Sequence, residues 1–367
     1  MDITVLKLHN DPDLSWLQTP VATIDQAART AALERQNQLT KPPGSLGRLE
    51  SLAVDFAGWQ GTPLPSLDTI QIRVFAGDHG IARVGVSAFP QAVTGEMIAN
   101  FARGGAAISV LAQQYGADFQ VVNMGTATPL PAEIAVHPQI RNRPLMAGTG
   151  NICAQSAMDR IVLAKALQAG ASEINHNDRT KLFIGGEMGI GNTAVSAALV
   201  SLLLKLPAEE TVGRGTGVDD IRLAHKREAV NRALALHGSK CASPLDALRR
   251  LGGLEIAALT GAYISAAQRG IPSLVDGYIC TTAALLACQI NPGVRDWLLF
   301  GHRSAEPGHR HLLTALAAEP LLDLQMRLGE GSGAAVAIPL LQSALALHRS
   351  MATFGEAGVS EKESVDD

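Results

Sequence analysis

Short apolar runs, each ending at glycine or a small polar residue and each followed by a helical pattern, constrain the fold of this chain most strongly. The clearest are Thr69–Ala76, Phe119–Met124, Lys181–Ile184, Ser273–Val275 and Trp297–Phe300. Strands that alternate with helices favour a parallel sheet covered by helices on both faces. We therefore predict an α/β fold. Ligands of such sheets bind beyond the carboxyl ends of the strands, so chemistry is expected in the loops after these runs.

Three helical segments stand apart from this alternation. Ala194–Leu206 and Gly333–Ser350 are apolar on most faces, so each is expected to lie either in the core or at a subunit contact. Asp25–Gln36 precedes the first strand by a long stretch and is expected to pack with the C-terminal helix as a small helical domain. The polar, acidic tail from Gly355 to Asp367 is expected to be disordered.

The composition excludes several classes of protein. With 47% apolar and 17% charged residues among 367, the chain is globular. A net charge of −4, without a block of Lys and Arg, argues against a nucleic-acid partner. No apolar run is long enough for a membrane span, and the first residues lack a signal-peptide pattern, so a cytoplasmic location is expected. The 4 cysteines form no CxxC pair and are expected to be free thiols.

Glycine-rich segments are the most prominent candidates for a ligand site. They are Leu39–Glu50, Gly185–Thr193, Gly213–Asp220 and Arg327–Gly333, and the last three each run into a helix. Glycines before a helix let backbone N–H groups turn toward an anion, and the helix dipole adds positive charge there. The segments therefore favour a phosphate site, although glycine-rich turns also occur in α/β domains without one.

Named phosphate and metal motifs do not fit the sequence. It contains neither GxxxxGK[ST] nor a GxGxxG after a strand. The pair Asp219–Asp220 follows a glycine loop and is expected to begin a helix. His302, His309 and His311 have no carboxylate or cysteine at a convincing interval, so no metal is expected.

Two glutamates lie in glycine frames, Glu187 in GGEMG and Glu330 in GEGSG. Such frames disfavour a helix or strand interior, and small neighbours let a substrate approach a carboxylate. A helix that begins near Gly333 would keep Glu330 ionised, as a general base requires. The alternative is a loop glutamate that caps a helix or binds a lysine. Asp78 and His79 follow the first strand, where His79 either contacts a substrate or only fixes the loop.

Several motifs in order resemble one family. They are KPPGSLGRLE, AGDHG, FPQAVTGEM, GTGNI, GGEMGIGNT, GRGTGVDD, LVDGYI, GHRSAEPGH and RLGEGSGAA, from about Leu39 to about Ser350. The chain thereby resembles the nicotinate-nucleotide:dimethylbenzimidazole phosphoribosyltransferases, which make the lower-ligand nucleoside of cobalamin. The resemblance implies a homodimer without a cofactor. Each subunit would have a large domain with a Rossmann-like sheet (residues 39–333) and a small helical domain (residues 1–38 with 334–354).

The resemblance also implies roles for particular residues. Glu330 matches the general base of the family. The positions that match substrate contacts are Glu187, Gly189, Gly215, Lys226, Ser304 and Arg327. Some relatives hold the incoming base with a serine and a glutamine where this chain has Phe89 and Met97, so its base pocket is more apolar. Benzimidazole, dimethylbenzimidazole and adenine therefore remain open as the base.

The implied reaction suits these residue types. Nicotinate mononucleotide would release a neutral pyridine nitrogen without an acid or a metal, and one carboxylate would take the N–H proton of the attacking base. Two alternatives are a dinucleotide-dependent oxidoreductase and a non-catalytic carrier. The missing dinucleotide fingerprint argues against the first, and Glu330 in its glycine frame argues against the second.

Overall fold

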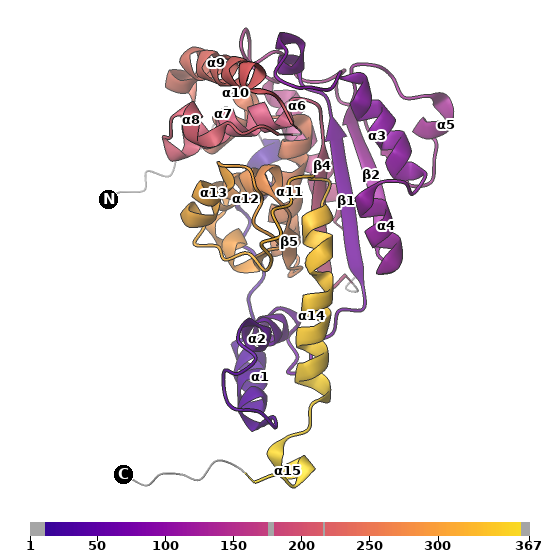
Figure 1. Cartoon of the computed structure of the whole chain (residues 1–367), viewed down its shortest axis with the longest axis vertical. Helices are drawn as coiled ribbons and strands as arrows, with labels where there is room; N and C mark the ends of the chain where they lie inside the picture. The colour runs from indigo at the N-terminus through magenta and orange to yellow at the C-terminus, as the bar shows by residue number, and fades with distance from the viewer. Residues whose placement is uncertain (1–11, 175–179, 216, 361–367) are drawn as a thin grey trace.

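The computed structural model describes residues 12–174, 180–215 and 217–360 and has the predicted α/β fold. Within this part of the chain, parallel strands form one sheet in the order β3-β2-β1-β4-β5-β6 (Figure 1). They are β1 (Ile70–Gly77), β2 (Asp118–Gly125), β3 (Ile140–Asn142), β4 (Leu182–Met188), β5 (Ser273–Val275) and β6 (Leu298–Phe300). All but β3 confirm the predicted strands. β3 was not predicted, because it is short and buries only Ile140.

The strand β1 lies between β2 and β4 in the middle of the sheet, and every one of its residues is buried. Side chains alternate between the two faces of a strand. Ile72 and Val74 therefore belong to the core on one face, and Phe75 belongs to the core on the other. Burial on both faces, which here includes Gln71 and Arg73, is typical of a parallel strand that helices cover on both sides.

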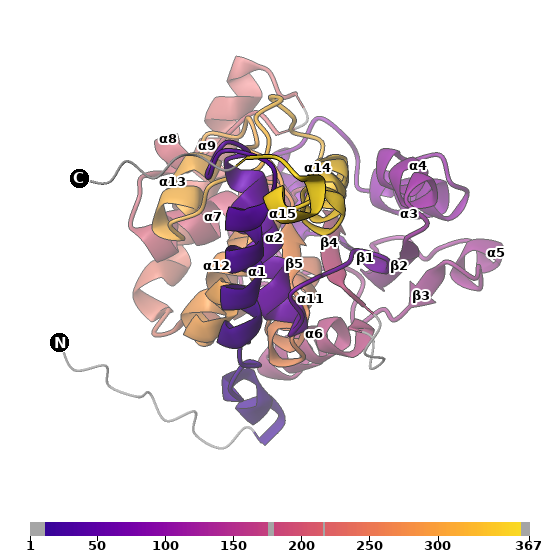
Figure 2. The ribbon, with the colours of Figure 1, turned by 90° about the horizontal axis from the view of Figure 1, so that it is seen from below.

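Helices cover both faces of the sheet (Figures 1 and 2). The α-helices are α1 (Gln26–Gln38), α2 (Arg48–Gln60), α3 (Ala92–Ala102), α4 (Ala107–Gln114), α5 (Ala132–Ala135), α6 (Arg160–Glu173), α7 (Asn192–Leu204), α8 (Ala208–Thr211), α9 (Asp220–His237), α10 (Pro244–Leu251), α11 (Leu254–Gln268), α12 (Tyr278–Ile290), α13 (His309–Ala315), α14 (Ser332–Ser350) and α15 (Phe354–Ala357). Short 3-10 helices cover Pro12–Gln18, Gly80–Val84, Gly238–Lys240 and Pro292–Trp297. Helices α2, α3, α4 and α14 share the core of Ile72, whereas α6, α7, α11 and α12 share that of Phe75. No described helix is long and apolar enough to cross a membrane.

The helices from the two ends of the chain lie side by side, as Figure 1 shows. α1 packs on α2, and α14 packs on both α2 and β4. The predicted helix at Asp25–Gln36 is confirmed, with the side chain of Asp25 accepting a hydrogen bond from the N–H of Ala28. The boundaries of a small helical domain at residues 1–38 and 334–354 stay a prediction.

The predicted disordered tail is wrong at its start. Residues 354–357 form α15, because Thr353 and Glu356 cap its first turn reciprocally. The rest of the predicted tail is described only as far as Ser360, and residues 361–367 lie outside the described part.

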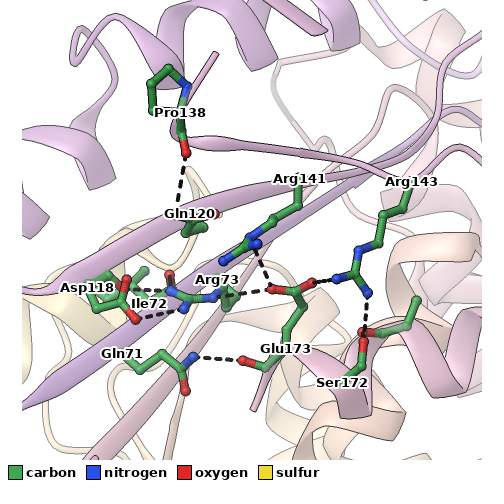
Figure 3. A network of polar contacts seen from close by, with 11 residues as sticks. Gln71, Ile72, Arg73, Asp118, Gln120, Pro138, Arg141, Arg143, Ser172 and Glu173 are labelled. Atoms are coloured by element: carbon green, nitrogen blue, oxygen red, sulfur yellow. Dashed lines mark hydrogen bonds and ion pairs between the residues drawn. The ribbon is translucent and has the colours of Figure 1, made fainter. Parts of the chain in front are cut away.

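A network of charged side chains joins the strands toward their amino ends (Figure 3). Arg73 of β1 is almost fully buried, and its Nη2 lies 2.7 Å from Oδ2 of Asp118. On the other side, its Nε lies 3.6 Å from Oε2 of Glu173, the last residue of α6. Arg141 of β3 and Arg143, which follows that strand, approach the carboxylate of Glu173 at 4.0 Å and 3.2 Å. The network thus ties together β1, β2, α6 and the end of β3.

Candidate functional site

A cavity opens at the carboxyl ends of β4, β5 and β6, next to the point where the strand order reverses between β1 and β4. Such a reversal leaves a crevice in which the ligands of open α/β sheets bind. Residues 187–193, 276–280 and 327–330 line the cavity, with Ser87, Gly215, His302, Ser304 and Glu306. Three of the four predicted glycine segments thus meet at this cavity.

Glu330 lies in the wall of the cavity with 6% of its surface exposed. Its φ is +67°, and those of Gly329 and Gly331 are +91° and +86°, so the segment turns through the left-handed region that favours glycine. Oε2 of Glu330 has no hydrogen-bond partner among the described residues. Burial and the nearby charge of Asp276 raise the pKa of Glu330 to about 7. A carboxyl group that titrates near neutral pH is suited to take and release a proton.

The prediction that the following helix keeps Glu330 ionised is wrong, because Asp276 occupies the N-terminus of α14. Oδ2 of Asp276 accepts a hydrogen bond from the N–H of Gly331 at 3.1 Å, and Oδ1 accepts one from Ala334 at 2.8 Å. The positive end of the helix therefore stabilises the carboxylate of Asp276. Glu330 lies beside that negative charge, which opposes its ionisation.

Glu187 lies at the cavity as an internal residue of β4, so the expectation that it avoids a strand is wrong. It pairs with Phe75 of the central strand, which extends β4 through Met188. Its carboxyl group accepts hydrogen bonds from the side chain of Asn192 and the N–H of Glu330. Burial, followed by the charges of Asp276, Glu255 and Glu330, raises its pKa well above the usual range. Its surroundings therefore disfavour the ionised form of this carboxyl group.

Lys226 of α9 is buried next to the cavity. Its Nζ donates to Oγ1 of Thr193 at 2.8 Å and to the carbonyl of Gly213 at 3.0 Å. Burial lowers its pKa to about 8, against the raising effect of Glu306. Thr193 is in the first turn of α7, whose positive end faces the cavity. An ammonium group, a hydroxyl and a helix N-terminus together suit a phosphate group.

The predicted contacts Gly215 and Arg327 meet one another at this end of the cavity. Nη1 of Arg327 donates to the carbonyl of Gly215 at 2.9 Å, and the N–H of Gly215 donates to Oε1 of Glu306 at 2.8 Å. The peptide groups on both sides of Gly215 are thus held by two other loops. The prediction that Asp219–Asp220 begins a helix is confirmed, since Asp219 caps α9.

Ser304 also lines the cavity, and His309 orients it. The N–H of Ser304 donates to Nδ1 of His309 at 2.8 Å, so Nε2 carries the proton that binds Oγ1 of Thr281 at 3.0 Å. Burial lowers the pKa of His309 to about 3 and keeps the ring neutral. His302 lies 3.4 Å from Oδ1 of Asp276. Burial lowers its pKa, but the hydrogen bond and charge of Asp276 outweigh burial and leave it raised.

Besides Lys226, which lies behind the wall, four of the predicted contacts do not line the cavity. Asp78 is buried and accepts hydrogen bonds from Oγ1 of Thr94 and the N–H of Ala127. Nε2 of His79 lies 2.8 Å from Oε1 of Glu255, with both side chains fully buried. These contacts fix the loop, which was one of the two interpretations of His79. Phe89 lies before α3 and is 47% exposed, and Met97 lies within α3.

Gly189 has a structural reason to be glycine. A Cβ at this position would lie 2.3 Å from the carbonyl oxygen of Gly77 and 2.9 Å from His79.

Asp276, His302 and Glu306 were not predicted as site residues. Asp276 could have been found, because it follows a predicted strand directly, as site residues of parallel sheets do. Within the described ranges, no group of three or more His, Cys, Asp or Glu side chains could hold a metal ion.

Comparisons with known proteins agree over nearly the whole chain. Residues 21–359 match the family described as Phosphoribosyltransferase. A nicotinate-nucleotide–dimethylbenzimidazole phosphoribosyltransferase of Pseudomonas aeruginosa is 56% identical over 95% of this chain and 99% of the relative. One from Xanthomonas axonopodis pv. citri is 58% identical over 94% and 99%. The crystal structure of CobT from Thermus thermophilus superposes with a TM-score of 0.86 at 44% identity, covering 92% of this chain and 100% of that one.

Proposed function

Because the chain belongs to this phosphoribosyltransferase family, we propose that its cavity transfers the 5-phosphoribosyl group of nicotinate mononucleotide to 5,6-dimethylbenzimidazole or a related base. The products are α-ribazole phosphate and nicotinate, and the reaction belongs to the assembly of the nucleotide loop of cobalamin. The observation that carries the proposal is the partly unpaired carboxylate of Glu330, which lies in the cavity wall and has a pKa of about 7.

Glu330 acts as the general base. The attacking nitrogen of benzimidazole gains a bond to C1′ while the other ring nitrogen loses its proton, which a carboxylate placed beside the ring accepts. Such proton transfer typically contributes about 10²–10⁴-fold to a rate. The raised pKa serves this role, because the carboxylate is ionised in part at neutral pH and is also basic enough to hold the proton. The alternatives of an oxidoreductase and a carrier lose their support once the family is known.

The nucleotide is held by the groups at the other end of the cavity. Lys226, Thr193 and the N-terminus of α7 suit the 5′-phosphate, and Arg327 shapes the loop at Gly215. A phosphate fixed there orients the ribose, so that the entering base attacks the face opposite to the leaving nicotinate. The negative charges of Asp276 and Glu255 near Glu187 favour the positive charge that develops on the ribose as the old bond breaks.

The direct test is to incubate the purified protein with nicotinate mononucleotide and, separately, benzimidazole, dimethylbenzimidazole and adenine. Chromatography should show one base becoming ribosylated as nicotinate appears in equal amount. If none of these bases is ribosylated, the proposed function is wrong.

Replacement of Glu330 by glutamine tests its role. The variant Glu330→Gln should fold and lose about 10²–10⁴-fold in kcat, because glutamine cannot accept the proton. Glu319→Gln is the matched control, since the side chain of Glu319 is 79% exposed and lies outside the cavity. Turnover of Glu330→Gln near that of the control would remove Glu330 from the role of base.

We also infer a cytoplasmic homodimer. Support comes from the resemblance and from a shallow groove on the outer side of α14, lined by Ser343, Ala346, Leu347, Ser350 and Met351. Light scattering of the purified protein during size-exclusion chromatography should give a mass twice that of one chain, which is 38.4 kDa.

A further inference from the structure

Two of the carboxyl groups that line the cavity have an oxygen without a hydrogen-bond partner in the described part of the chain. One is Oε2 of Glu330, and the other is Oε2 of Glu306. Glu187 and Asp276, in contrast, each accept two hydrogen bonds from the surrounding protein. An unpaired carboxylate oxygen in a buried position costs free energy unless a ligand donates to it. The proposed mechanism uses Glu330 and gives Glu306 no task.

Glu306 is held in one place although half of its carboxylate is unsatisfied. Only 7% of its surface is exposed, and Oε1 accepts the N–H of Gly215 at 2.8 Å. Oε2 lies against Gly213, where a Cβ would come within 2.1 Å of that oxygen, so only glycine leaves room for it. Glu306 nevertheless lines the cavity, so its carboxylate belongs to the wall that a bound nucleotide contacts.

The neighbours of Glu306 identify the part of the nucleotide that it meets. Its charge acts on Lys226, whose Nζ donates to Thr193 beside the N-terminus of α7. That group of donors suits the 5′-phosphate, and the ribose is joined to the phosphate through a single carbon. A carboxylate beside the protein groups that bind the phosphate is therefore placed to face the ribose.

The chemistry of the substrates gives the same answer. An ionised carboxylate only accepts hydrogen bonds. The phosphate and the carboxylate of nicotinate mononucleotide are acceptors at neutral pH, so the two ribose hydroxyls are its hydrogen-bond donors. On the basis of the proposed function, we propose that Glu306 accepts a hydrogen bond from a ribose hydroxyl and makes the enzyme selective for ribonucleotides. The two unpaired oxygens of the cavity then match the two kinds of donor in the two substrates, the base N–H and the ribose O–H.

The test compares nicotinate mononucleotide with its 2′-deoxy and 3′-deoxy analogues. For the wild-type enzyme, kcat/KM should fall about 10- to 100-fold for the analogue that lacks the bound hydroxyl, as expected for a hydrogen bond to a charged group. For Glu306→Ala the same ratio should shrink to about threefold or less. Glu306→Gln, which keeps an oxygen for Gly215 but has no charge, should give an intermediate ratio.

The ratio is measured within one enzyme preparation, so a variant that is only partly folded lowers both values and leaves the ratio unchanged. Glu319→Gln should keep the wild-type ratio. If turnover of a variant is too slow, calorimetric affinities for the same three nucleotides give the comparison. The proposal is overturned if Glu306→Ala discriminates as the wild type does, or if the wild type does not discriminate. Failure of the wild type to use nicotinate mononucleotide at all would instead overturn the proposed function.

Discussion

At the residue scale, the site places several carboxyl groups close together and gives each a different set of partners. Asp276 accepts hydrogen bonds from two backbone N–H groups at the start of α14. Burial and the charges of Asp276, Glu255 and Glu330 raise the pKa of Glu187 well above its usual range, whereas burial beside Asp276 raises that of Glu330 to about 7. Groups of one chemical type therefore differ in pKa because their surroundings differ, which lets one of them be tuned to act as a base.

The pH dependence of the reaction follows from the pKa values of Glu330 and Lys226. The base must be ionised, so kcat/KM should fall about tenfold per pH unit below about 7, the raised pKa of Glu330. Lys226 must be protonated to bind phosphate, so kcat/KM for the nucleotide should also fall above about pH 8. Initial rates between about pH 5.5 and 9 would check both limbs. An acidic limb that persists unchanged in the residual activity of Glu330→Gln would assign it to another group.

Glu330 and Glu187 could be singled out from the sequence because a charged residue among glycines is unusual. Their protonation could not, since it depends on Asp276, which is distant along the chain. Glu306 was missed for a similar reason. In GHRSAEPGH it resembles any polar loop residue, and only the fold brings it to Gly215.

At the element scale, β4 and the loop before α14 approach each other more closely than side chains would allow. A Cβ on Gly186 would lie 2.2 Å from the carbonyl oxygen of Glu330. The variant Gly186→Ala must therefore push the Glu330 segment away from the strand. Because misplacing a catalytic group by about 1 Å can cost about 10²-fold, we expect kcat to fall by that order.

The matched control for Gly186→Ala is Gly261→Ala, which makes the same change where α11 crosses α6. A Cβ there would lie 2.0 Å from the carbonyl oxygen of Leu167, and neither residue lines the cavity. Overpacking of this kind costs about 1–3 kcal/mol, so Gly261→Ala should lower the melting temperature and leave kcat of the folded enzyme near normal. If the two variants lost kcat equally, the approach of Gly186 to Glu330 would not be what positions the base.

Elements could be predicted from the sequence where apolar runs are long and buried, as in β1 and β2. The end of β4 could not, because GGEMG lacks the residues that favour strands and is held there by pairing with β1. Likewise α15 lies in a polar tail, and its start depends on a capping box of only two residues.

At the scale of the whole molecule, the sheet separates the chemistry from a buried ion network. The cavity lies at the carboxyl ends of β4, β5 and β6, whereas Arg73, Asp118 and Glu173 meet toward the amino ends of β1, β2 and β4 (Figure 3). Arg73 has 2% of its side chain exposed, so its charge depends on these two carboxylates. The network joins β1, β2 and α6, and none of its three residues lines the cavity.

The substitution Glu173→Gln tests whether this network supports the fold alone. It leaves Arg73 with one carboxylate partner in a buried position, and breaking a buried pair in this way costs about 3 kcal/mol. Urea unfolding should show the lower midpoint, while the KM values for both substrates stay unchanged. The exposed pair of Asp323 with Arg303 is the control, since Asp323→Asn should change stability by about 0.5 kcal/mol or less. A Glu173→Gln variant of normal stability but altered KM would mean that the amino and carboxyl ends of the strands are coupled, so that the network also influences the cavity.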